Sequence, residues 1–153
     1  RQRQMCIRDR YGAEYMSHMV HCANYLGKKL REYGYDIADI KGVISYTHQI
    51  FIRCSKEEMD TIYENAYKCE VTLNKKHKEL FGGYGIRLGT QEISRYDWND
   101  EALDIVAKIV YMLSDKNVNL EEVMKLKESL PDKKIHYTLK DKYVNRFKEL
   151  MNL

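Results

Sequence analysis

Hydrophobic residues recur at the three- and four-residue spacing of amphipathic helices in five stretches of the chain, about 12–33, 56–67, 99–113, 120–130 and 139–151. Boundary signals accompany them. Gly34 follows the first stretch, and glycine is common just past a helix end. Ser55-Lys56-Glu57-Glu58 has the form of a capping box before the second. Asp97 or Asn99 can cap the third, and Pro131 stops the fourth.

Shorter runs rich in β-branched and aromatic residues predict strands at Gln49–Arg53, Glu70–Asn74 and 84–90. Residues 75–83 form a polar loop in this interpretation, and 35–37 and 42–45 are short extended pieces. The order strand, helix, strand, strand predicts an α+β fold. We expect a short three-stranded, mostly antiparallel sheet, covered by helices and followed by extra C-terminal helices.

Length and composition fit one globular domain. The 153 residues are 44% hydrophobic and 32% charged, with one proline. No apolar run reaches the length of a membrane span, so we expect no membrane partner. The four cysteines are scattered without a C-x-x-C pair, which predicts reduced thiols and a cytoplasmic location.

The first ten residues differ from the rest. They hold four Arg and one Asp of the chain's 26 basic and 23 acidic residues, without helical or strand periodicity. The stretch resembles a translated sequencing-adapter peptide, which predicts that it is an artefact and that the real protein begins further upstream. A basic arm for nucleic acid is the alternative. The remaining residues are 22 basic and 22 acidic, which predicts no nucleic-acid partner.

Most motifs of cofactor and metal chemistry are missing. The chain has no P-loop, H-E-x-x-H or G-x-S-x-G sequence. His18, His21 and Cys22 would lie near one face of the first helix, and imidazole and thiolate are zinc ligands. Three candidates without a fourth favour ordinary packing and surface positions, so we predict no metal site.

Arg87 is the exception, because it stands alone in a short apolar strand between Gly85 and Gly89. Charged side chains are rarely buried without a partner, and flanking glycines let a ligand or backbone approach closely. Two interpretations stay open from the pattern alone. Arg87 binds a carboxylate with its two-pronged guanidinium, or it pairs with a neighbouring Asp or Glu of the sheet.

Several segments, in the right order between about residues 15 and 115, resemble serine hydroxymethyltransferase. The matching segments are Tyr33-Gly34-Tyr35-Asp36-Ile37 with the family's "RGYDLV", Thr47-His48-Gln49-Ile50 with "DNHLVLVD", Glu70-Val71-Thr72-Leu73-Asn74-Lys75-Lys76 with "ITVNKN", Phe81 and Gly85-Ile86-Arg87-Leu88-Gly89-Thr90 with "F-V-T-S-G-I-R-I-G-T-P-A", and Arg95 with the helix from Asp100 with "TTRGFKEEDM".

The resemblance implies a pyridoxal 5'-phosphate (PLP) enzyme of fold type I acting on α-amino acids, in amino-acid and one-carbon metabolism. Arg87 matches the residue that binds the substrate's α-carboxylate, and His48 and Thr90 are possible site-lining residues. The family's Schiff-base Lys, in its "T-T-T-H-K" motif, has no counterpart here, so the fragment alone is expected to be inactive. The missing large domain would bind most of the cofactor, and the full-length protein is expected to be a homodimer.

The resemblance also divides the chain. Residues 1–10 are the predicted artefact, and 11–34 form a helix leading in from the missing large domain. Residues 35–115 form the small C-terminal domain, and 116–153 are a helical extension.

Two departures affect the expected reaction. Only His77 to Leu80 separate Lys76 from Phe81, where the family has a longer folate-binding loop, and Gln91-Glu92 replaces Pro-Ala. Both count against tetrahydrofolate dependence. A non-folate PLP aldolase, an aminotransferase of the same fold and a free-standing, non-catalytic interaction domain remain alternatives.

Overall fold

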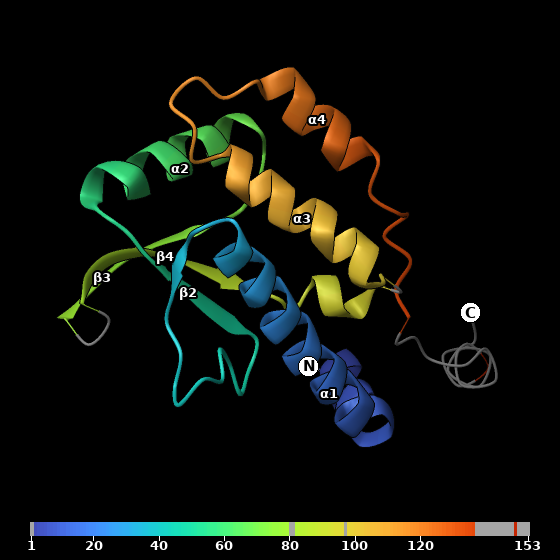
Figure 1. The fold of residues 1–153 in the computed structure, drawn as a ribbon. Coiled ribbons are helices and arrows are strands. Elements are labelled where there is room, and N and C mark those ends of the chain that lie inside the picture. The colour runs from blue at the N-terminus through green and yellow to red at the C-terminus, as the bar shows by residue number, and fades with distance from the viewer. Residues whose placement is uncertain (1, 80–81, 97, 137–148, 150–153) are drawn as a thin grey trace.

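Helices cover one face of a small antiparallel sheet (Figure 1). The computed structural model describes residues 2–79, 82–96, 98–136 and 149. In chain order the elements are α1 (Gln2–Glu32), β1 (Asp36–Ile37), β2 (Gln49–Arg53), α2 (Lys56–Lys68), β3 (Asn74–Lys78), β4 (Gly83–Gly89), the 3-10 helix η2 (Ile93–Arg95), α3 (Asp100–Met112) and α4 (Leu120–Glu128).

The sheet has the order β1-β2-β4-β3, and each neighbouring pair is antiparallel. The predicted α+β class is confirmed. β2 has the predicted bounds, and β4 is the predicted strand around Arg87. One more strand joins the three predicted ones, because β1, inside the extended piece 35–37, pairs with the end of β2.

The prediction for β3 was wrong in its position. The strand is Asn74–Lys78, which was expected to be a polar loop, whereas 70–73 form the connection before it. β3 is an edge strand whose backbone pairs with β4, so its side chains can be polar on both faces. Two of them have local partners. The Lys75 ammonium lies 2.6 Å from an Asp60 carboxylate oxygen, and the His77 ring stacks on Tyr84.

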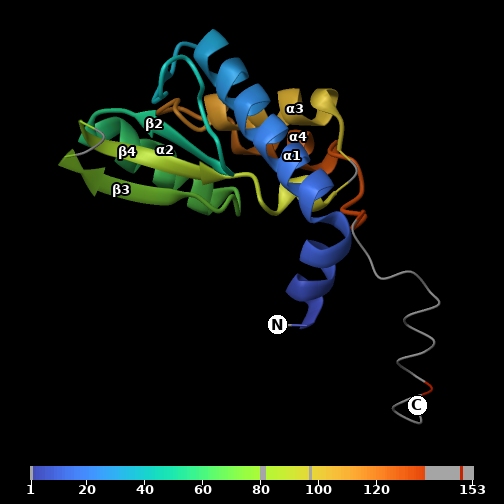
Figure 2. The ribbon, with the colours of Figure 1, turned by 90° about the horizontal axis from the view of Figure 1, so that it is seen from below.

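The core lies between the sheet and the helices. Strand alternation directs Ile50, Ile52 and Ile86 to the helical side, where each is fully buried. Figure 2, seen from below, shows the strands in front of α2. The helices contribute to the same core, with members including Leu30 of α1, Ile62 of α2, Ile109 and Val110 of α3, and Val123 of α4.

Local capping signals set several helix ends as predicted. Glu58 donates its backbone N–H to the Ser55 hydroxyl oxygen, and the Ser55 N–H donates to the Glu58 carboxylate. Asn99 caps α3 by accepting from the Ala102 N–H, whereas the other candidate, Asp97, lies outside the described residues. Gly34 has a positive φ of 92° just after α1.

The N-terminal end of the chain differs from the simplest sequence interpretation, whereas most of the predicted C-terminal helix is not described. α1 begins at Gln2, although 1–10 lack helical periodicity in the sequence. The helix predicted for 139–151 lies outside the described residues, apart from residue 149. Among the described residues, no helix combines the length and apolar character that crossing a membrane requires.

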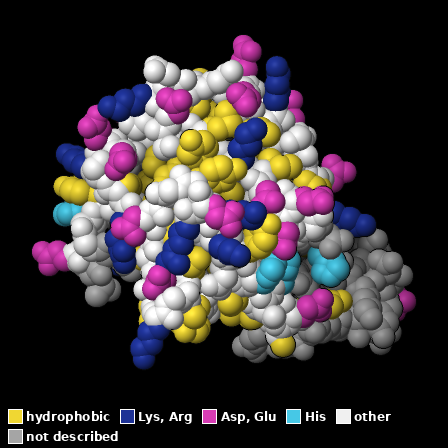
Figure 3. Space-filling view, viewed as in Figure 1, with side chains coloured by type: hydrophobic (Ala, Val, Ile, Leu, Met, Phe, Trp, Pro, Cys, Tyr) yellow, Lys and Arg dark blue, Asp and Glu magenta, His cyan; other side chains and the backbone are white. Residues whose placement is uncertain are grey.

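The surface seen in Figure 3 mixes charges of both signs. Lysine and arginine side chains lie between aspartate and glutamate side chains, and hydrophobic groups are exposed among them. Among the residues that the structure describes, three large hydrophobic side chains are more than half exposed, Tyr67 at 81%, Ile40 at 66% and Tyr46 at 64%.

Candidate functional site

Arg87 projects from the face of the sheet opposite the helices. Its neighbours Ile86 and Leu88 are buried on the helical side, so the alternation of β4 directs Arg87 the other way. In the register, Arg87 lies opposite Phe51 of β2 and Asn74 of β3. Directly opposed residues in an antiparallel sheet point to the same face, so these three side chains are neighbours.

The Arg87 side chain is half-buried, and it makes no hydrogen bond or salt bridge with any other described residue. Arg53 provides a contrast on the same face of the sheet, because its guanidinium lies 3.0 Å from the Asp36 carboxylate. The expected alternative, an Asp or Glu of the sheet paired with Arg87, is therefore not observed among the described residues.

A hollow of about 440 Å³ lies beside Arg87 on this face. We call it the sheet-face hollow, and it is lined by Ala38, Asp39, Ile40, Ile44, Gln49, Phe51, Arg53, Lys76, Lys78 and Arg87. Two positions of β4 on this face carry no side chain that could fill the hollow, because Gly83 and Gly85 lie there, opposite Lys78 and Lys76 in the register. A Cβ atom on Gly85 would lie 2.7 Å from the Phe51 ring.

A second cleft, of about 430 Å³, is lined by Arg87, by Gly89 at the end of β4 and by residues of α3. We call it the end cleft. Val106, Ile109 and Val110 of α3 give it an apolar wall, and His48 and Arg87 contribute polar groups. Arg87 therefore borders two hollows of similar size.

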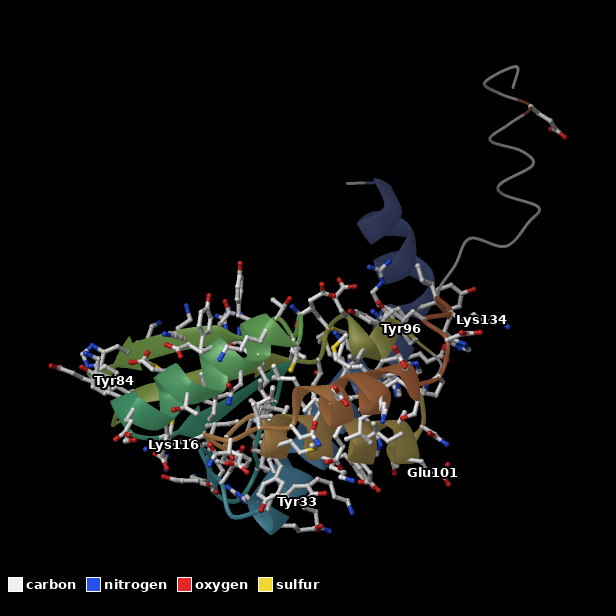
Figure 4. All side chains as sticks on the ribbon, turned by 90° about the horizontal axis from the view of Figure 1, so that it is seen from above. Tyr33, Tyr84, Tyr96, Glu101, Lys116 and Lys134 are labelled. Atoms are coloured by element: carbon white, nitrogen blue, oxygen red, sulfur yellow. The ribbon has the colours of Figure 1, made fainter. Side chains whose placement is uncertain are left out.

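One wall of the end cleft comes from the chain after α4, which sequence reasoning missed. The Trp98 indole N–H donates to the Pro131 carbonyl oxygen at 3.1 Å, and the His136 N–H donates to the Arg95 carbonyl oxygen at 2.7 Å. Figure 4 shows Tyr96 and Lys134 close together where this segment passes η2. The sequence signalled only that Pro131 ends a helix, and no local pattern reveals a contact more than 30 residues distant.

The two other predicted site residues occupy different positions. His48 lines the end cleft and is half-buried. Thr90 is fully buried, and its hydroxyl lies 3.1 Å from the Met19 carbonyl oxygen and 3.3 Å from that of His48. Thr90 thus joins β4, α1 and the start of β2, and it does not line either hollow.

The histidines and cysteine of α1 lie together but have separate contacts. The His18 Nε2 lies 3.6 Å from the Cys22 Sγ, whereas the His21 Nε2 lies 2.9 Å from the Asp100 carboxylate. Burial raises the pKa of the Cys22 thiol, which favours the neutral form over the thiolate that binds metals. Among the described residues, no group of three or more His, Cys, Asp or Glu side chains could hold a metal ion.

None of the described lysines fits the role of Schiff-base partner to PLP. A lysine that forms a Schiff base needs a desolvated amine, and none of the described lysines is buried. Lys29, Lys76 and Lys127 are half-buried, and Lys127 donates to the Cys69 carbonyl oxygen. The group available to a ligand in this part of the chain is the Arg87 guanidinium, which has no partner among the described residues and borders both hollows.

Comparison with known proteins agrees with the sequence motifs. The chain is 29% identical over 118 residues to serine hydroxymethyltransferase of Picrophilus torridus, and the match covers 71% of this chain and 27% of that protein. The resemblance to serine hydroxymethyltransferase is confirmed. The chain therefore spans about a quarter of the length of this relative. No protein-family model matches the chain.

The fold has a close structural counterpart. The crystal structure of L-threonine transaldolase from Pseudomonas fluorescens in its internal aldimine state superimposes with a TM-score of 0.73 and 18% sequence identity. The superposition covers 92% of this chain and 34% of that chain. The small antiparallel sheet with its helices is thus the fold of a domain found in a fold-type-I PLP protein.

Proposed function

We propose that this chain is the C-terminal part of a serine hydroxymethyltransferase-like, PLP-dependent enzyme, in which Arg87 binds the α-carboxylate of an amino-acid substrate. The observation that carries the proposal is the half-buried Arg87 side chain, which has no partner among the described residues and borders two hollows. The likeness to serine hydroxymethyltransferase supports the same assignment.

The chemistry of arginine suits this task. A half-buried charge without a partner is unfavourable, so an incoming carboxylate compensates the guanidinium as well as binding to it. The guanidinium presents paired N–H donors that match both carboxylate oxygens, which fixes the ligand's orientation. Gly85 and Gly89 flank Arg87 and add no side chain that would obstruct this approach.

The rest of the reaction belongs to a longer protein in this proposal. PLP and its lysine would lie mainly in a large domain that precedes this chain, and the chain alone would be inactive. The subunits would pair as a homodimer in the cytoplasm. The domain limits 11–34, 35–115 and 116–153 are likewise part of the proposal, with 1–10 as an artefact.

The second candidate is a non-folate aldolase or aminotransferase of the same fold. It is favoured by the short connection from β3 to β4, since only four residues, 79–82, separate the two strands. Assaying the full-length enzyme with and without tetrahydrofolate distinguishes the candidates. A free-standing interaction domain would instead require a genuine start codon near Tyr11, which extending the gene sequence upstream will reveal.

Substitutions of Arg87 in the full-length enzyme test the proposed function. We expect Arg87→Ala to weaken amino-acid binding roughly 10- to 100-fold, the range for a lost hydrogen bond to a charged group. Arg87→Lys should retain little of the amino-acid affinity, because an ammonium lacks the planar pair of donors. Titrating each variant with amino acid, and following the absorbance of the bound cofactor, gives the dissociation constant of the amino acid for that variant.

Lys75→Ala is the matched control, because Lys75 lies in the neighbouring strand β3 but faces the helical side and pairs with Asp60. It should leave amino-acid affinity within about twofold, since exposed ion pairs contribute little. Unchanged affinity in both Arg87 variants would overturn the carboxylate role.

A further inference from the structure

The sheet-face hollow holds more positive charge than Arg87 alone. Lys76 and Lys78 of β3 line it too, and neither ammonium group makes a hydrogen bond or salt bridge with another described residue. The other charged groups of the hollow are compensated, because Arg53 pairs with Asp36 and Asp39 pairs with Arg31. The hollow therefore has three uncompensated cations and no uncompensated carboxylate among its described lining residues.

The register of the sheet places these three cations around the sheet-face hollow. Arg87 lies opposite Asn74, so Lys76 is its diagonal neighbour on β3, with Cβ atoms about 7–8 Å apart or less. Gly85 lies opposite Lys76 and Gly83 opposite Lys78, so β4 presents no side chain between the lysines and Phe51. Figure 2 shows this strand arrangement from the uncovered side.

Such an arrangement is unfavourable without a ligand. Like charges on neighbouring strand positions repel, and both Arg87 and Lys76 are half-buried, which lowers their screening by water. A ligand with one negative group relieves only one of them. A ligand with two negative groups separated by a few bonds relieves both, at a spacing that arginine and lysine side chains can span.

We propose that the sheet-face hollow selects a dianionic ligand, with one carboxylate on Arg87 and a second acidic group on Lys76, assisted by Lys78. This inference rests on the proposed function of Arg87 and extends it to a substrate class: an amino acid whose side chain carries an acidic group. The apolar side chains of Ile40 and Ile44 at the border of the hollow would contact the hydrocarbon part of the ligand.

The test uses the 153-residue chain and two small probes, glutarate as the dianion and butyrate as the monoanion. Backbone amide NMR shifts of Gly83, Gly85 and Gly89 report binding, at one fixed ionic strength because surface charge interactions are screened by salt. We expect glutarate to bind about tenfold more tightly than butyrate. Lys76→Gln should reduce glutarate affinity to that of butyrate and leave butyrate affinity unchanged.

Lys75→Gln is the matched control, since Lys75 lies on the same strand but faces the helical side and pairs with Asp60. It should change neither affinity by more than about twofold. Equal affinity for the two probes, no binding of either, or an equal effect of Lys75→Gln would overturn the proposal. A second result separates the two parts of the proposal. If Lys76→Gln weakens glutarate binding but Arg87→Gln changes the affinity for neither probe, Lys76 binds an acidic group and the carboxylate role of Arg87 is rejected.

The unliganded chain gives a second readout. Removing one of two repelling cations should raise the thermal midpoint of Lys76→Gln slightly above that of the parent chain at low salt, and the difference should vanish at high salt. A lower midpoint for Lys76→Gln at low salt would contradict the predicted repulsion.

Discussion

At the scale of single residues, the interpretation of a charged side chain depends on whether another residue pairs with it. Arg53 and Arg87 are both arginines on one face of one sheet, and the sequence places both in strands. Arg53 is neutralised by Asp36 of β1, whereas Arg87 has no partner among the described residues. The sequence predicted the strand around Arg87 correctly. It left the two interpretations of the charge equal, because pairing across strands depends on register.

Cys54, which directly follows β2, gives a residue-scale prediction about reactivity. Burial, with a smaller effect of Glu58, raises the pKa of its thiol from 9.0 to about 11. Since the thiolate is the nucleophile, we expect iodoacetamide to modify Cys54 on the order of 100-fold more slowly in the folded chain at about pH 8. Mass spectrometry of the peptide over time measures the rate.

The same cysteine in concentrated urea is the control, because unfolding removes both causes of the shift. Glu58→Gln should accelerate the folded-state reaction modestly. A folded-state rate equal to that in urea would show that the thiol is not protected.

At the scale of elements, capping sequences were better guides than composition. The Ser55 capping box predicted the start of α2, and the structure confirms both of its hydrogen bonds. β3 was missed because strand propensity reflects packing of side chains, whereas this edge strand is held by backbone pairing with β4. A lysine-rich segment gives no sign of such pairing before the sheet exists.

Two glycines of β4 should respond differently to the same substitution. A Cβ atom on Gly85 would meet the Ile52 carbonyl oxygen and the Phe51 ring, so β2 and β4 would have to separate. We expect Gly85→Ala to lower the free energy of unfolding by about 1–3 kcal/mol, measured by urea denaturation.

Gly89→Ala is the comparison, because the nearest atoms to its Cβ would belong to the flexible Gln91 side chain. It should cost less than about 1 kcal/mol. Equal losses in the two variants would show that the Phe51–Gly85 contact does not limit the approach of the strands.

At the scale of the whole molecule, the segment after α4 returns to close the end cleft. Its attachment rests on a few contacts, including the Trp98 hydrogen bond to Pro131 and the backbone bond from His136 to Arg95. Connections this sparse open locally with less free energy than the core requires.

Trp98→Phe keeps an aromatic ring but removes the hydrogen bond to Pro131. We expect the loss of about 1 kcal/mol to increase the open population of residues 130–136 roughly fivefold. Trypsin should then cleave after Lys133 and Lys134 correspondingly faster, as followed by mass spectrometry. Tyr111→Phe, which leaves this segment untouched, is the control. An unchanged cleavage rate in Trp98→Phe would show that other contacts hold the segment.

The sequence by itself determined the elements whose signals are local: the capping box, the amphipathic helices, the strand around Arg87 and the family resemblance. Tertiary structure decided which residues become neighbours. It paired β3 with β4 and placed Lys76 diagonally across from Arg87. It buried Thr90 between α1 and the sheet, and it brought residues 130–136 to the end cleft. The physical reason is that hydrogen bonds within a helix turn join residues close in sequence, whereas register and docking join residues whose sequence distance carries no local pattern.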